Sequence, residues 1–165
     1  MVKERCKMMY DGDFLYSYSQ RAKENYDVMK NTEYGFTMLL CSFVGVVAII
    51  DDNAREELFC DQDIPNFITM IKCDTCKKDN NSRVLAFYRH LRNSLCHLKI
   101  DNDRIKSNNE STISSIILKD YWEHEKKGKK VKDKTFECTL TIETLEKLFY
   151  VVVDVIQKKL AKKED

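Results

Sequence analysis

The sequence predicts a mainly α fold, a helical bundle with a small β-hairpin before the C-terminal helix. Three observations support this fold class. The chain has 165 residues, which suits one hydrophobic core and therefore a single domain over residues 1–165. It has only one proline and four glycines, which favours long helices over a sandwich with many turns. Apolar residues also recur at spacings of three and four in most segments.

Six segments have the apolar spacing of helices, and polar ends flank them. We expect residues 1–13 to be a loose leader and residues 161–165 a polar tail. The run Asp51-Asp52-Asn53 can cap the helix that starts near residue 54, and Thr141 can cap the last helix. The predicted helices are about residues 14–30, 34–50, 54–58, a stretch opened by Pro65, 83–98 and 142–160.

Two later segments predict the strands of the hairpin. Residues 113–121 are rich in β-branched side chains, and residues 135–140 alternate strictly between polar and apolar. A basic connection over residues 126–134, with Gly128 near its turn, joins them. Residues 101–111 are polar and predict a loop. The sheet should therefore be a single small hairpin.

The segment from Tyr34 to Ile50 has no charged side chain. It is slightly shorter than the roughly 20 residues that span a membrane, and acidic residues flank it on both sides. We therefore expect a buried central helix and no membrane insertion. The charged N-terminus lacks the apolar region of a secretory signal, so we expect a cytoplasmic protein.

The seven cysteines are an odd number and lie mostly beside apolar residues, which favours reduced thiols over a disulfide framework. Cys73 and Cys76 form one C-x-x-C pair, without the second pair or nearby histidines of a zinc site. We expect no metal and no cofactor. The net charge of +1 excludes a broad cationic surface, so contacts with nucleic acid would need a local patch, such as Lys129 and Lys130.

The predicted helix over residues 83–98 has an unusual outer face. A helical wheel places His90, Asn93 and His97 along this face, with Arg89 beside them and Arg92 at its margin. Imidazoles carry protons and guanidiniums bind phosphate, although an ordinary exposed face with chance histidines has the same composition. The opposite, core-facing stripe is predicted to be Val84, Phe87, Tyr88, Leu91, Ser94, Leu95 and Leu98.

The phrase Arg92-Asn93-Ser94-Leu95-Cys96-His97 resembles the motif of the HEPN ribonucleases. That motif is an arginine, then a polar residue that is often asparagine, and a histidine four to six residues after the arginine. Here four residues separate Arg92 from His97. The motif helix also follows an apolar helix and precedes the hairpin and closing helix, as in this family. One departure is Leu98, where many members have glycine or another small residue.

The resemblance implies a HEPN-like bundle and a metal-independent endoribonuclease that cleaves RNA by attack of the ribose 2′-oxygen. It implies Arg92, Asn93 and His97 as catalytic residues, and we expect Arg89, His90, Lys129 and Lys130 to bind the RNA. Arg92 and His97 diverge by ~140° on one helix, which favours a site shared across a homodimer. A toxin or defence protein with a cognate antitoxin, for example one resembling a nucleotidyltransferase, would fit. The alternative is a catalytically silent HEPN module that binds RNA or a protein partner.

Overall fold

The computed structural model describes residues 12–73, 80–107, 110–126 and 128–161. Its five helices and four strands divide between two compact units. One unit comprises residues 1–61 and 148–165, and the other comprises residues 62–147.

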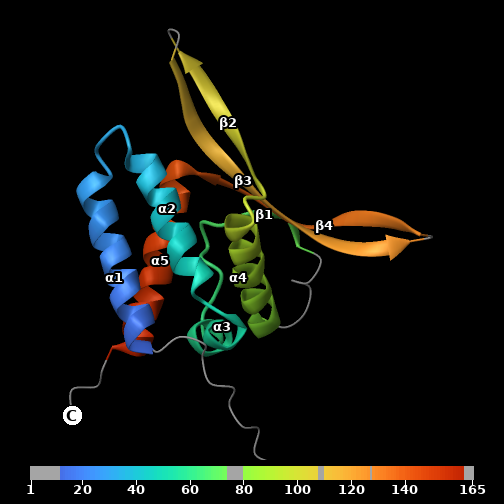
Figure 1. The fold of residues 1–165 in the computed structure, drawn as a ribbon, viewed down its shortest axis with the longest axis horizontal. Coiled ribbons are helices and arrows are strands. Elements are labelled where there is room, and N and C mark those ends of the chain that lie inside the picture. Colours follow the sequence, from blue (N-terminus) through green and yellow to red (C-terminus); the bar gives the residue numbers. More distant parts are fainter. Residues whose placement is uncertain (1–11, 74–79, 108–109, 127, 162–165) are drawn as a thin grey trace, which may run out of the picture. The chain divides into compact units, whose positions relative to one another are not determined.

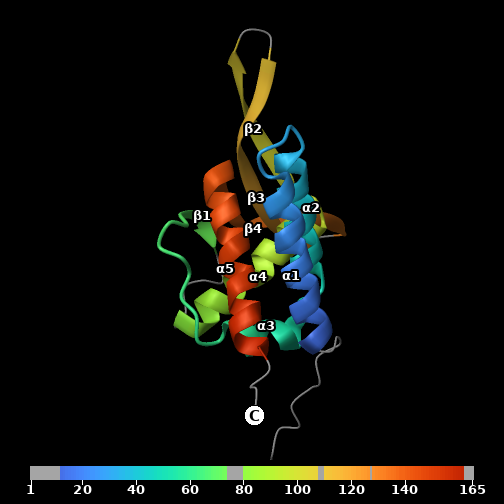
Figure 2. The ribbon, with the colours of Figure 1, turned by 90° about the vertical axis from the view of Figure 1, so that its left-hand side faces the viewer.

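The first unit is helical. It contains α1 (Gly12–Met29), α2 (Gly35–Ala48), α3 (Asp52–Phe59) and most of α5 (Ile142–Leu160). Figures 1 and 2 show α1, α2 and α5 side by side. Aromatic rings join these helices, because Phe149 on α5 contacts the ring of Tyr26 at 5.7 Å and that of Phe43 at 5.6 Å. Of the predicted run over residues 51–53, Asp51 is the cap and accepts a hydrogen bond from the Ala54 N–H. The predicted cap Thr141 is confirmed, since it accepts a hydrogen bond from the Thr144 N–H.

The uncharged segment forms α2 as predicted, but it is not buried on all sides. Leu39, Phe43 and Val46 are buried, whereas Thr37 and Cys41 are exposed. No single helix in the described part of the chain is long and apolar enough to cross a membrane. α2 and α3 pass that test of length and composition only as a pair bent by 100°.

The second unit packs α4 (Asn80–Cys96) on a four-stranded antiparallel sheet. The strands are β1 (Met70–Cys73), β2 (Ile100–Ser107), β3 (Glu110–Lys126) and β4 (Lys129–Thr141), in the order β1-β4-β3-β2. Figure 1 shows the β2–β3 and β3–β4 hairpins as two arms that point in different directions. The buried side chains of this unit include Val84, Phe87, Leu91, Leu95, Ile116, Leu118, Phe136, Cys138 and Leu140.

The prediction of a single small hairpin is wrong in extent, because two edge strands were missed. β2 occupies most of the predicted loop over residues 101–111. Its residues 101–104 are exposed, so this strand has no alternation of apolar side chains to reveal it. β1 lies where a helix after Pro65 was predicted. A four-residue strand is stabilised mainly by its backbone pairing with β4, which leaves no periodic signal in the sequence.

The cysteines are partly as predicted. Cys41, Cys60, Cys96 and Cys138 are free thiols. Cys73, at the end of β1, is disulfide-bonded, so the prediction of reduced thiols is wrong at this position. Spacing along a chain does not report which thiols meet in space. Cys76 lies outside the described residues.

Candidate functional site

Helix α4 ends abruptly at the motif. The Lys99 N–H donates to the Ser94 carbonyl at 2.9 Å and the Leu98 N–H donates to the Leu95 carbonyl at 3.3 Å. This pair of bonds is a Schellman motif, in which the residue after the helix adopts a left-handed conformation. Leu98 is that residue, with φ of 50°. Its side chain is 71% exposed, so the prediction that it faces the core is wrong.

We expect Leu98→Gly to raise the free energy of unfolding by about 1 kcal/mol, because a left-handed backbone is costly for any residue with a Cβ. Little burial is lost, since the leucine side chain is already exposed. Urea denaturation checks this prediction. Leu98→Val is the matched control and should destabilise, because a β-branched residue tolerates a positive φ poorly. A glycine variant less stable than the wild type would contradict the prediction.

The main polar cluster of α4 forms around Asp120, which lies on β3 and is 5% exposed. One carboxylate oxygen, Oδ2, accepts hydrogen bonds from His90 Nδ1 at 2.9 Å and Asn93 Nδ2 at 3.0 Å. The other, Oδ1, accepts from Lys99 Nζ and from the Tyr121 backbone N–H, both at 2.9 Å. A buried carboxylate therefore orients the amide of Asn93, the middle residue of the motif.

These hydrogen bonds determine the protonation state of Asp120. Burial alone would raise the pKa of its carboxyl group. The hydrogen bonds from His90, Lys99, Asn93 and the Tyr121 N–H outweigh burial and lower the pKa well below its ordinary value of 3.8. The group is therefore a carboxylate at neutral pH and only accepts hydrogen bonds, so His90 Nδ1 carries a proton.

A buried serine fastens the same helix to the same strand. The Ser94 hydroxyl lies 2.7 Å from the His90 carbonyl and 2.8 Å from the Lys119 carbonyl on β3. The second contact crosses from helix to sheet. Ser94 thus maintains the register in which α4 presents Asn93 to Asp120.

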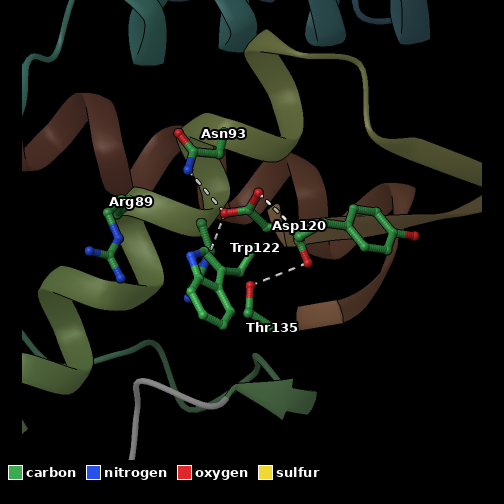
Figure 3. Close-up of a pocket in the computed structure, with 7 residues that line it drawn as sticks. Arg89, Asn93, Asp120, Trp122 and Thr135 are labelled. Carbon is green, nitrogen blue, oxygen red and sulfur yellow. Dashed lines mark hydrogen bonds and ion pairs between the residues drawn. The ribbon is translucent and has the colours of Figure 1, made fainter. Parts of the chain in front are cut away.

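An open pocket of about 490 Å³ lies beside this cluster. Its walls come from α4, β3 and β4. Arg89 and Asn93 contribute from the helix and Trp122 and Thr135 from the strands (Figure 3). The ladder between β3 and β4 shifts register here, because Asp120 pairs with Phe136 and Tyr121 pairs with Lys134. Thr135 is thus the extra residue of a β-bulge, a feature that redirects side chains near functional sites.

The structure brings three of the predicted site residues to this pocket, in different environments. Arg89 is exposed, and the amide of Asn93 is half-buried. His90 is only 3% exposed and stacks on Phe136 with ring centroids 5.0 Å apart. The placement of His90 on the outer face is therefore wrong, because the sheet covers a wider arc of the helix than a wheel suggests. Within that pocket, the Nδ1 atom of His90 is committed to Asp120.

Arg92 and His97 are not brought together within the described residues of the chain. His97 is exposed at the end of α4, one turn beyond Asn93 on the same helix face. Arg92 is half-buried, and its Nε atom is buried with no hydrogen-bond partner among the described residues. Its charge lies close enough to Cys96 to oppose the rise in thiol pKa that burial of Cys96 causes.

The two predicted RNA-binding lysines of the β3–β4 arm are exposed on opposite faces. In the register of this hairpin, Lys129 pairs with Lys126 and Lys130 with Glu125. Paired residues share a face and successive residues alternate. Lys129 therefore lies on the face of Trp122 and His124. Lys130 lies on the face of Glu123, whose pKa it helps to lower.

Sequence reasoning missed Asp120, Lys99 and Trp122. One signal for Asp120 was present, because Ile116, Leu118 and Asp120 occupy alternating inward positions of one strand, and a carboxylate there needs partners. The partners themselves lie 21 to 30 residues away in the sequence. In the described residues, no three His, Cys, Asp or Glu side chains group as possible metal ligands.

The sequence model of a family described as HEPN pEK499 p136 matches residues 1–163. Neither a curated protein nor a solved structure matched the chain. The family match covers the whole described structure, including α4 and the strand that carries Asp120.

Proposed function

Because the chain belongs to the HEPN pEK499 p136 family, we propose that it is a metal-independent endoribonuclease whose active site is shared across a homodimer. The observation that carries the proposal is the end of α4. There His97 is exposed, Asn93 is oriented by a buried carboxylate, and Arg92 is half-buried beside Asn93 in the chain. A guanidinium has a planar fork of donors that is suited to bind phosphate.

The proposed reaction divides into proton transfer and charge stabilisation. The ribose 2′-oxygen attacks the adjacent phosphorus, the bond from phosphorus to the 5′-oxygen breaks, and a 2′,3′-cyclic phosphate and a 5′-hydroxyl result. A base takes the proton of the 2′-hydroxyl, and an acid gives a proton to the leaving oxygen. His97 suits these two roles, since an imidazole can both accept and donate a proton. Arg92 suits the stabilisation of the phosphorane-like transition state.

In the proposed dimer, Arg92 and His97 of one site come from two copies of the chain. Arg92 and His97 are five residues apart and point in directions that differ by ~140° on an ideal helix. A two-fold axis beside this face brings the His97 of one protomer toward the Arg92 of the other.

The biological role that we propose is that of a toxin or defence nuclease acting on cellular or invading RNA, held in check by a cognate antitoxin. The alternative is a catalytically silent HEPN module that binds RNA or a protein partner. The hydrogen bonds around Asp120 favour neither the nuclease nor the silent module, because a firmly held helix α4 suits catalysis and binding equally. The exposed imidazole of His97 at the helix end favours the nuclease.

The experiment incubates the purified chain with mixed RNA in EDTA and determines the ends of the products. We expect cleavage with 2′,3′-cyclic phosphate and 5′-hydroxyl ends, and a dimer in sedimentation at micromolar concentration. Binding without cleavage would replace the nuclease by the silent module. Cleavage that needs an added divalent cation would contradict the metal-independent mechanism, and cleavage by a strict monomer would contradict the shared site.

A further inference from the structure

The single tryptophan of the chain is an exposed, pre-ordered aromatic surface. The Trp122 side chain is 59% exposed, although an indole usually packs into a core. Its ring stacks on that of His124, with centroids 4.2 Å apart and planes inclined by 20°. One face of the indole is thus supported by a neighbouring ring. Since Trp122 is already held in place, little side-chain freedom is lost when a ligand stacks on it.

We propose that Trp122 and the pocket beside it bind one unpaired base of single-stranded RNA. The inference rests on the proposed function for its choice of RNA as ligand. The pocket of about 490 Å³ lies within the range of small-ligand sites. Arg89 and Asn93 border it opposite the strand residues, so a planar aromatic wall faces polar and cationic groups (Figure 3). Unstacked bases are recognised by this combination of aromatic and cationic surfaces.

The same face of the β3–β4 arm continues the site toward its tip. Trp122, His124 and Lys126 are alternate residues of β3, and Lys129 pairs with Lys126. The two exposed lysines therefore lie ~13 Å along the strand from the indole. Asp133, which pairs with Trp122, also lies on this face, and its carboxylate is 3.8 Å from His124 Nε2. Lys126 and Lys129 are placed to bind phosphates that flank the stacked base.

The pocket also adjoins the motif. Asn93 lines the pocket, and His97 lies one turn further along the same face of α4. A base stacked on Trp122 would therefore place its neighbouring phosphodiester at the outer face of α4. Trp122 thus acts as a positioning residue that selects which bond is cut, and it restricts cleavage to unpaired RNA, because the bases of a duplex are already stacked.

The test uses the fluorescence of Trp122, which reports on this site alone because no other tryptophan is present. The full-length His97→Ala protein, which should cleave about 10²–10⁴-fold more slowly than the wild type, is titrated with a single-stranded oligoribonucleotide, with the same sequence as a duplex, and with a mononucleotide. We expect strong quenching by the single strand only. A mononucleotide lacks the flanking phosphates, and equal quenching by it would overturn the assignment to RNA.

Substitutions then measure the contribution of stacking to binding of a labelled strand. Trp122→Ala should weaken binding about tenfold to a hundredfold, whereas Trp122→Phe should retain most of the affinity, since base stacking on an aromatic ring tolerates the change of ring. Lys129→Ala should weaken binding and reduce its salt dependence more than Lys130→Ala, the matched control on the opposite face. Far-UV circular dichroism establishes that each variant is folded.

The outcomes separate this proposal from the nuclease proposal. Quenching without any cleavage by the wild-type chain would refute the nuclease and leave the base site standing. Two results together would refute the base site and leave the nuclease: RNA leaves the Trp122 fluorescence of the His97→Ala protein unchanged, and Trp122→Ala cleaves with the same KM as the wild type. If the chain neither binds nor cleaves RNA, both proposals are refuted.

Discussion

Replacing His97 by alanine should lower the rate of RNA cleavage by about 10²–10⁴-fold, the usual contribution of a general acid or base, and should leave the fold intact. The side chain is exposed at the end of α4, so its removal creates no cavity. Product formation in EDTA and a thermal melt measure the two effects. Cys96→Ala is the matched control at the neighbouring position. It should cleave normally, because burial raises the pKa of this thiol and keeps it protonated.

The role of Arg92 is tested in the same cleavage assay. Arg92→Ala should lower turnover more than RNA affinity, and Arg92→Lys should restore little, because an ammonium lacks the planar fork of donors. A mixture of Arg92→Ala and His97→Ala chains forms heterodimers in which one shared site keeps both groups. Partial recovery of cleavage by that mixture is expected. If His97→Ala cleaves as fast as the wild type, the nuclease assignment is wrong.

Replacing Asp120 by alanine should destabilise the chain by roughly 3 kcal/mol or more, because His90 and Lys99 lose a buried carboxylate partner. Cleavage should fall as well, through Asn93, whose amide is no longer oriented. Urea denaturation measures the first effect, and kcat against KM measures the second. Asp101→Asn is the matched control on β2. Asp101 is exposed and forms an ion pair with Lys119. Losing this ion pair should change the stability of the chain little.

The contribution of Asp120 should also depend on pH with a definite sign. Its pKa is lowered in the folded chain, so the stabilisation is fully present above the ordinary value of 3.8 and is lost as the pH falls below that value. The difference in stability between the wild type and Asp120→Asn should therefore shrink as the pH is lowered from 6 toward 3. A constant difference over this range would contradict the role assigned to the carboxylate.

The helices were the most predictable part of this chain. α1, α2, α3, α4 and α5 each begin and end within a few residues of the predicted bounds. Their apolar spacing and caps are local properties, encoded in contiguous residues. The strands were less predictable. β4 was found only where it alternates, and β2 was missed because both faces of its residues 101–104 are exposed.

The sequence by itself determined the motif, since Arg92, Asn93 and His97 lie within one and a half turns of a single helix. It also determined the family, which the match over residues 1–163 shows. Only the tertiary structure decided what surrounds the motif. Asp120 reaches His90 and Asn93 across the packing of α4 on β3, and Trp122 reaches the same pocket beside a β-bulge. The physical reason is that a helical wheel describes one helix in isolation, whereas the burial and hydrogen bonding of its side chains depend on the strands that cover the helix.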